Sequence, residues 1–140
     1  MVARQYTAAD DPLTYQIIGC AIRVHKELGP GLKESAYEEC LEKTLTQCGL
    51  TIYRQPRVAI SFEGETLDKE YRPDFIINNE VVVEVKSVSG FLPIHQAQLL
   101  TYMKLASVER GLLINFNVAL LKNGIKRLIM TKAPLGASVD

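Results

Sequence analysis

A predicted β-hairpin constrains the fold of this chain more than any other feature. Residues 69–77 and 81–87 are rich in Val, Ile and Phe, and the asparagine pair between them favours a turn. Asp74, Glu84 and Lys86 interrupt these apolar runs. Because a buried charge is costly unless it is paired or bound to a metal, these three side chains need a specific arrangement.

The alternation of side chains along the two strands predicts the register of the hairpin. On the second strand, alternate valines point to one face and Glu84 points to the other. A continuous apolar face places Phe75 opposite Val83, because a slip of one residue would turn every side chain over. This register requires a three-residue loop, residues 78–80, and it places Asp74 opposite Glu84.

Two carboxylates that face each other across a strand pair repel. A divalent cation would remove the repulsion, and oxygen ligands suit Mg²⁺ or Mn²⁺, so we predict that Asp74 and Glu84 hold one of these ions. Lys86 follows on the same face, where its ammonium group would stabilise developing negative charge or orient a water. The alternative is a solvated hairpin face with an ordinary Lys–carboxylate pair.

The length and composition limit the class of protein. The 140 residues predict a single domain over residues 1–140, with a core at about 13–130 and flexible tails at 1–10 and 133–140. Lys and Arg number 16, as do Asp and Glu, so the formal net charge is zero. This balance excludes a strongly basic nucleic-acid-binding coat, and any phosphate-binding surface must be a local patch.

The cysteines and the apolar runs indicate the compartment. Cys20, Cys40 and Cys48 lack the spacing of a metal site, and their odd number fits a reducing compartment in which they are buried apolar residues. The sequence shows neither a signal peptide nor an apolar run that could cross a bilayer. We therefore predict a cytoplasmic protein with no membrane partner.

Periodicity and breakers predict an α/β (α+β) class, in which helices and strands both contribute to one domain. The predicted order is helix, helix, three strands, helix, two strands. The predicted helices are 12–28, 32–48 and 93–106, and the predicted strands are 58–62, 69–77, 81–87, 111–116 and 125–130.

The second predicted helix carries a carboxylate on its apolar stripe. Glu34 is three residues before Tyr37 and seven before Leu41, so it points inward, whereas Glu38 and Glu39 are predicted on the outer faces. Stabilisation of the helix N-terminus is one explanation for Glu34.

Two motifs resemble those of a known group. Asp74 followed by Glu84-Val-Lys86 resembles the active-site motif of the PD-(D/E)XK nuclease superfamily. Gly31-Leu-Lys-Glu34-Ser-Ala-Tyr37 is similar to the defining motif of the GxxExxY family of that superfamily. The resemblance implies a restriction-endonuclease-like αβββαβ core, in which helices flank a mixed central sheet, with an extra N-terminal helix.

The resemblance also implies roles for individual residues. Glu34 would be a third carboxylate of the metal site, and the backbone carbonyl of Val85 a further metal ligand. Gln98 and Tyr102 stand four residues apart on the third helix and resemble an active-site pair of the exonuclease-like branch. The residues considered as contacts to nucleic acid are Arg72, His95, Lys126 and Arg127, with a solvated sheet edge as the alternative for the last two.

These observations predict a nuclease that uses Mg²⁺ or Mn²⁺ to hydrolyse DNA, with RNA as the alternative substrate. Lys86, Glu34, Gln98 and Tyr102 would be its catalytic residues. A second hypothesis is a non-catalytic module on the same scaffold, as a homodimer or a subunit of a larger complex, because the chain is small and has zero net charge. In a third, the acids and Lys86 form only a structural ion network.

Overall fold

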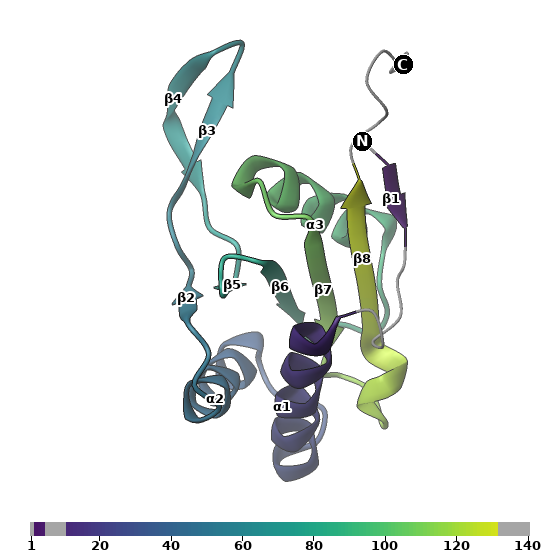
Figure 1. The fold of residues 1–140 in the computed structure, drawn as a ribbon. Coiled ribbons are helices and arrows are strands. Elements are labelled where there is room, and N and C mark those ends of the chain that lie inside the picture. Colours follow the sequence, from purple (N-terminus) through teal and green to yellow (C-terminus); the bar gives the residue numbers. More distant parts are fainter. Residues whose placement is uncertain (1, 5–10, 132–140) are drawn as a thin grey trace.

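The computed structural model describes residues 2–4 and 11–131 (Figure 1). Within them the helices are α1 (Pro12–Leu28), α2 (Glu34–Gln47), α3 (Pro93–Ala106) and a short 3-10 helix (Leu121–Gly124). The strands are β1 (Val2–Arg4), β2 (Ile52–Arg54), β3 (Val58–Phe62), β4 (Glu65–Tyr71), β5 (Phe75–Ile77), β6 (Val81–Lys86), β7 (Arg110–Asn115) and β8 (Ile125–Thr131).

Six strands of the described residues form one mixed sheet in the order β1-β8-β7-β6-β5-β2. The neighbours β6 and β7 are parallel, and the other neighbouring pairs are antiparallel. β3 and β4 form a separate two-stranded sheet that extends away from the main sheet (Figure 1). The predicted α+β class, a mixed sheet flanked by helices, is confirmed.

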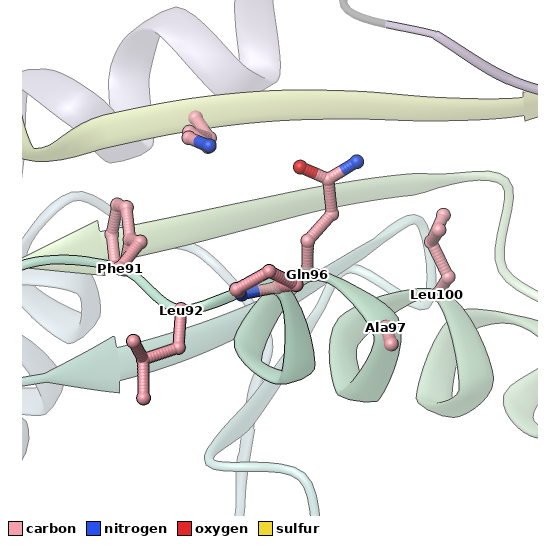
Figure 2. Close-up of a pocket in the computed structure, with 7 residues that line it drawn as sticks. Phe91, Leu92, Gln96, Ala97 and Leu100 are labelled. Atoms are coloured by element: carbon pink, nitrogen blue, oxygen red, sulfur yellow. The ribbon is translucent and has the colours of Figure 1, made fainter.

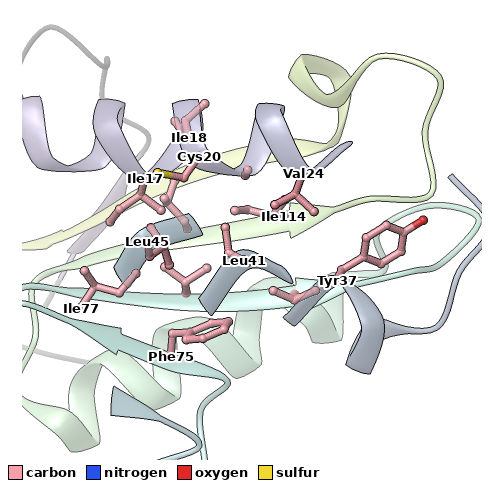
Figure 3. Close-up of a cluster of buried hydrophobic side chains, with 14 of the residues drawn as sticks. Ile17, Ile18, Cys20, Val24, Tyr37, Leu41, Leu45, Phe75, Ile77 and Ile114 are labelled. Atoms are coloured by element: carbon pink, nitrogen blue, oxygen red, sulfur yellow. The ribbon is translucent and has the colours of Figure 1, made fainter. Parts of the chain in front are cut away.

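The sheet has an apolar core on each face. On one face the alternate valines of β6 pack with α1 and α2 (Figure 3). On the other face Val82 packs with Leu99 and Met103 of α3. The predicted alternation along β6 is therefore correct, and Glu84 follows Val82 toward the face that α3 covers.

The start of α1 is fixed by its cap and by an ion pair to the sheet. The backbone N–H of Thr14 donates to Asp11 Oδ1 at 3.3 Å, so Asp11 is the N-cap of the helix, and Pro12 occupies its first turn. Arg110 Nη1 lies 3.4 Å from Asp11 Oδ1, so the N-terminus of α1 is tied to β7.

Tyr37 holds the junction between α1 and α2. Its side chain is fully buried, and its ring stacks on Phe116 with the centroids 4.5 Å apart. Its hydroxyl donates to the carbonyl of Gly29 at 2.6 Å and accepts from the backbone N–H of Leu32 at 3.1 Å. The tyrosine of the Gly31–Tyr37 motif thus fastens the turn that positions α2.

The structure differs from the predicted strands in three places. The predicted strand 69–77 is divided into β4 and β5, because Pro73 has no N–H to donate to a ladder. β2 was not predicted. The predicted flexible arm, residues 1–10, contains the edge strand β1, which pairs with β8; residues 5–10 and the predicted tail 133–140 lie outside the described residues.

The three cysteines are free, as predicted for a reducing compartment, but only Cys20 is buried. Cys40 is half-buried and Cys48 is exposed, so the predicted burial is wrong for Cys48. In the part of the chain that the structure describes, no helix combines the length and the apolar character needed to cross a membrane.

Candidate functional site

The hairpin of β5 and β6 has the predicted register. Phe75 pairs with Val83, and the two loop asparagines adopt positive φ angles of 52° and 55°. The backbone N–H of Asp74 donates to Glu84 Oε2 at 2.6 Å, and the N–H of Val85 donates to Asp74 Oδ2 at 2.7 Å. Each carboxylate therefore accepts a backbone hydrogen bond from the opposite strand, which fixes the two acids beside each other.

Burial and mutual repulsion make this pair retain protons. Glu84 is only 3% exposed, and its burial, followed by the charge of Asp74, raises its pKa to about 8. Burial likewise raises the pKa of Asp74 to about 7. Lys86 acts in the opposite direction on the pKa of both acids, but its effect is smaller than that of burial. Without further positive charge, the pair is not fully ionised at neutral pH.

We expect the metal-free protein to become less stable as the pH rises. The unfolded chain releases the protons of these two acids near their ordinary pKa values of 3.8 and 4.5, whereas the folded chain keeps them to about 7 and about 8. Between these limits the folded state binds more protons, so the free energy of unfolding falls with increasing pH.

Urea unfolding at about pH 5.5 and about pH 8.5 measures this effect. The free energy of unfolding should be lower at the higher pH by at least about 1.4 kcal/mol, which corresponds to one pKa unit. Asp74→Asn, which removes one acid and its repulsion of Glu84, should flatten the dependence. An unchanged pH dependence in this variant would contradict the assignment.

A chain of hydrogen bonds links Lys86 to α3. Lys86 Nζ donates to Gln98 Oε1 at 3.1 Å, and Gln98 Nε2 donates to the Tyr102 hydroxyl at 2.9 Å. Burial and, next, the charge of Glu84 raise the pKa of Tyr102, so its hydroxyl keeps its proton. Tyr71 stacks on Tyr102 with the ring centroids 4.8 Å apart, which holds this face of α3 against the strands. Lys86, Gln98 and Tyr102 therefore meet beside the acid pair.

The helix acid nearest the pair differs from the predicted one. Glu34 is half-buried and lines an open hollow with Ser87 and Asn117. Among the described residues, no three Asp, Glu, His or Cys side chains are close enough to bind one metal ion. The predicted convergence of Glu34 with Asp74 and Glu84 on one ion is therefore not found.

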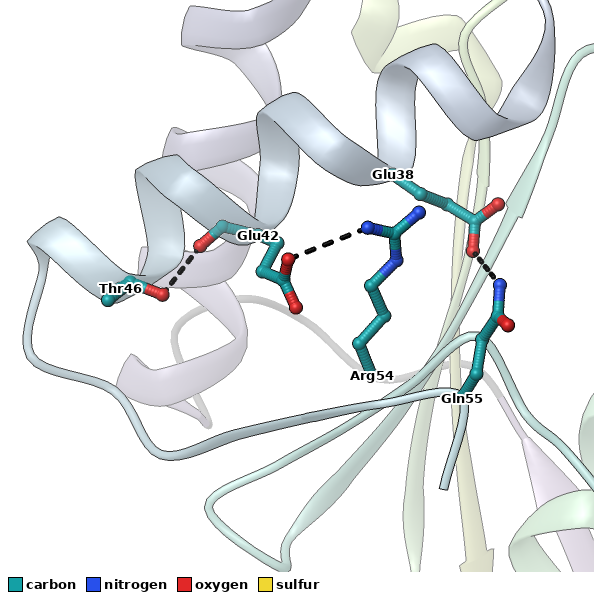
Figure 4. A network of polar contacts seen from close by, with 5 residues as sticks. All are labelled: Glu38, Glu42, Thr46, Arg54 and Gln55. Atoms are coloured by element: carbon teal, nitrogen blue, oxygen red, sulfur yellow. Dashed lines mark hydrogen bonds and ion pairs between the residues drawn. The ribbon is translucent and has the colours of Figure 1, made fainter. Parts of the chain in front are cut away.

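Glu38 lies closer to the site than the sequence predicted. It is 6% exposed instead of outward-facing, and its charge raises the pKa of both Asp74 and Glu84. Gln55 Nε2 donates to Glu38 Oε1 at 3.4 Å (Figure 4). The backbone N–H of Gln55 donates to the carbonyl of Asp74 at 2.8 Å. The sequence does contain a signal for Glu38. It stands four residues after Glu34, so both acids lie on one face of the helix.

The cation nearest Glu38 in Figure 4 is engaged elsewhere. Arg54 Nη1 lies 3.5 Å from Glu42 Oε1, one helical turn beyond Glu38. Within the described residues no ion pair to Glu38 is present. Glu38 thus adds negative charge near the acid pair without a matching cation.

The four residues considered as contacts to nucleic acid include two, Lys126 and Arg127, that point to opposite faces of the sheet. His95 and Lys126 both lie near Phe91. The ring centroids of His95 and Phe91 are 6.1 Å apart, and Lys126 Nζ lies 5.7 Å from the ring centroid of Phe91. Arg72 is exposed between β4 and β5. Arg127 pairs with Leu112, whose face of the sheet packs on α1 and α2, so Arg127 and Lys126 point to opposite faces of the sheet.

Lys126 also lines a pocket of about 430 Å³ between α3 and β8 (Figure 2). The other lining residues are Phe91, Leu92, Pro93, Gln96, Ala97 and Leu100. Gln98 and Tyr102 are absent from this lining, so the pocket lies on a different side of α3 from the acid pair. Its single charged residue gives it little capacity to bind a phosphate backbone.

The donor set suits a hard divalent cation. The carboxylates of Asp74 and Glu84 supply two oxygen donors, and Mg²⁺ typically binds one or two carboxylates and keeps several waters. The carbonyl of Val85 points to the same side as its N–H, which donates to Asp74, so it is directed toward the pair. A bound cation would compensate the negative charge of the Asp74 and Glu84 carboxylates.

An α+β fold with an Asp–Glu pair and a lysine at the end of a central hairpin defines a restriction-endonuclease-like protein. The family model of the PD-(D/E)XK nuclease superfamily matches residues 11–128, and the chain belongs to this superfamily. No curated protein and no solved structure matches the chain significantly. Members of the superfamily usually hydrolyse phosphodiester bonds and generally use divalent metals.

Proposed function

We propose that this protein is a nuclease that hydrolyses DNA with Mg²⁺ or Mn²⁺, and that it belongs to the GxxExxY branch of the superfamily through Gly31, Glu34 and Tyr37. The observation that carries the proposal is the crossed pair of hydrogen bonds that holds Asp74 and Glu84 together in a buried position. RNA is the alternative substrate.

Each side chain has a role that follows from its contacts. Asp74 and Glu84, with the carbonyl of Val85, would hold the cation, which when bound polarises a phosphodiester and makes water more acidic. The ammonium group of Lys86 stabilises the negative charge that develops on the phosphate oxygens. Gln98 holds this ammonium group in place through Oε1. The Tyr102 hydroxyl accepts from Gln98, so its own proton remains available for a phosphate oxygen.

Cleavage of DNA and RNA by the purified protein with Mn²⁺ tests the proposal. We expect the wild type to cleave DNA and Glu84→Gln to lose nearly all activity. Glutamine keeps an oxygen that accepts the N–H of Asp74, so the fold should survive, which circular dichroism can verify. Equal cleavage by both proteins would reject the proposed site.

We expect substitutions of Glu38 and Glu34 to reduce the affinity for a cation by different amounts. We expect Glu38→Gln to weaken Mn²⁺ binding about tenfold, the effect of removing a supporting residue near a metal, because its charge acts on both acids. Glu34→Gln should have a smaller effect, because its charge acts on the pKa of Asp74 more weakly than that of Glu38. Calorimetry with Mn²⁺ measures both affinities.

Glu39→Gln is the matched control, since Glu39 is an exposed acid of the same helix and its loss changes the net charge equally. Its affinity for Mn²⁺ should remain within about twofold of wild type, as expected for a screened surface charge. A larger loss in Glu34→Gln than in Glu38→Gln would restore the role that the sequence motif implies for Glu34.

The charge balance supports a second candidate, a non-catalytic module that pairs with another copy or with a larger complex. The formal net charge is zero, and Lys126 and Arg127 point to opposite faces of the sheet. Calorimetry separates the two candidates. Mn²⁺ binding that disappears in Asp74→Asn supports the nuclease, and an absence of binding in the wild type supports the module.

A further inference from the structure

Two cysteines from different helices are in direct contact. Cys20 Sγ in α1 lies 3.3 Å from Cys48 Sγ, at the end of α2. Cys20 is 3% exposed, whereas Cys48 is open to solvent. The two thiols are 28 residues apart in the sequence, so it is the packing of α1 on α2 that brings them together.

We propose that Cys20 and Cys48 form a redox-active dithiol that closes to an intramolecular disulfide by exchange with a low-molecular-weight disulfide such as oxidised glutathione. Cys48 is the residue that a soluble oxidant reaches, and Cys20 is the resolving thiol behind it. The proposal depends only on the α1–α2 packing, and therefore stands apart from the proposed nuclease activity.

The reaction proceeds in two exchange steps. The thiolate of Cys48 attacks one sulfur of oxidised glutathione, a mixed disulfide forms, and one glutathione leaves as a thiolate. The sulfur of Cys20 then attacks Cys48 Sγ, the bond to the second glutathione breaks, and the disulfide of the protein forms. The leaving glutathione thiolates take up the two protons given up by the cysteines. Two protein thiols are oxidised, and one glutathione disulfide is reduced to two thiols.

The order of these steps follows from the surroundings of Cys20. Burial, the hydrogen bond to Cys48 and the charge of Cys48 raise the pKa of Cys20 to about 11, so Cys20 is a poor first nucleophile. Once Cys48 is part of a mixed disulfide it carries no proton and no charge. Two of the three causes that raise the pKa of Cys20 are then removed, which favours the second step.

The local backbone allows the sulfurs to reach bonding distance. A disulfide requires about 2.05 Å between the sulfurs, so they must approach by roughly 1.2 Å. Cys48 follows the last residue of α2, and Gly49 with φ 79° turns the chain away directly afterwards. We expect the approach to come from this helix end, while the buried side chain of Cys20 in the middle of α1 stays in place.

Cys40 provides a matched control. It belongs to α2, is half-buried, and has no sulfur contact among the described residues. If the distance between the sulfurs decides which thiols react, Cys40 should not enter a disulfide.

Treatment of the intact protein with oxidised glutathione tests the proposal, with free thiols titrated and intact mass and peptide masses measured. We expect the wild type to lose two of its three free thiols, to lose the mass of two hydrogens, and to yield a Cys20–Cys48 peptide pair. Cys40→Ser should behave in the same way. Cys20→Ser should stop at one glutathione adduct on Cys48, and Cys48→Ser should not form a disulfide.

A stable glutathione adduct on wild-type Cys48, or a disulfide that involves Cys40, would overturn the proposal. Thermal unfolding gives an independent measure, because a cross-link between α1 and α2 restricts the unfolded chain. The midpoint of the oxidised wild type should rise and return to its original value with dithiothreitol, whereas that of Cys20→Ser should not change on oxidation. A rise of equal size in Cys20→Ser would also overturn the proposal.

Discussion

Lys86→Met is expected to lower the rate of Mn²⁺-dependent DNA cleavage by about 100- to 1,000-fold, the usual cost of removing a charge-stabilising group from a preorganised site. The ammonium group is held by Gln98 Oε1 at 3.1 Å and is the cation that acts on both acids. Methionine preserves most of the length of the side chain but removes the charge.

The same variant should retain Mn²⁺ binding, because Asp74 and Glu84 remain. It should also move the protonation of this pair to higher pH, since Lys86 lowers the pKa of both acids. Lys69→Met, at an exposed position of β4, is the control and should cleave at the wild-type rate. A structural ion network predicts instead that Lys86→Met is tolerated, with a stability equal to or higher than that of the wild type.

Tyr37→Ala is expected to reduce the free energy of unfolding by about 3–5 kcal/mol, the cost of truncating a buried aromatic residue. The side chain is fully buried and stacks on Phe116. The carbonyl of Gly29 and the N–H of Leu32 would lose the hydroxyl that joins them. Chemical denaturation monitored by circular dichroism measures the change.

Two further variants separate the contributions to this loss. Tyr37→Phe keeps the ring and removes the hydroxyl, so it should cost about 1 kcal/mol. Tyr15→Ala, at a position of α1 that is 66% exposed, should change stability by no more than about 0.5 kcal/mol. If Tyr37→Phe kept its stability but lost DNA cleavage, the hydroxyl would have a role in the site instead of in the junction.

The hairpin could be predicted from the sequence because burial permits one register only. The alternate valines of β6 required Phe75 to face Val83, and this pairing set Asp74 beside Glu84. The contact between Gln98 and Tyr102 could also be predicted, because residues four apart on a helix are neighbours. Local geometry was enough to predict both the register of the hairpin and this contact.

Local geometry could not show which acid of α2 lies closer to the site. Glu34 and Glu38 share one face of α2, and the choice between them depends on where the connection after β2 passes. Gln55, with φ 48°, brings that connection to Glu38 and to the carbonyl of Asp74. β2 has only three residues, too few for an alternating pattern to stand out.

The faces that the basic residues of the last strand occupy could not be assigned from the sequence. Lys126 and Arg127 are adjacent in sequence, and both were considered as contacts to nucleic acid. Adjacent residues of a strand point to opposite faces, so Lys126 lies near Phe91 while Arg127 is on the face that packs against α1 and α2.

β5 begins at Phe75, so the backbone N–H of Val85 donates to the side chain of Asp74 instead of to the backbone of another strand. The Asp74 carboxylate therefore accepts the last hydrogen bond of the hairpin and is also a candidate metal ligand. A substitution that removes the carboxylate ligand therefore also removes a hydrogen bond that stabilises the sheet, unless the new residue can accept it. A relative without nuclease activity would still be under selection to keep a hydrogen-bond acceptor here, so an aspartate or asparagine at position 74 is by itself poor proof of activity.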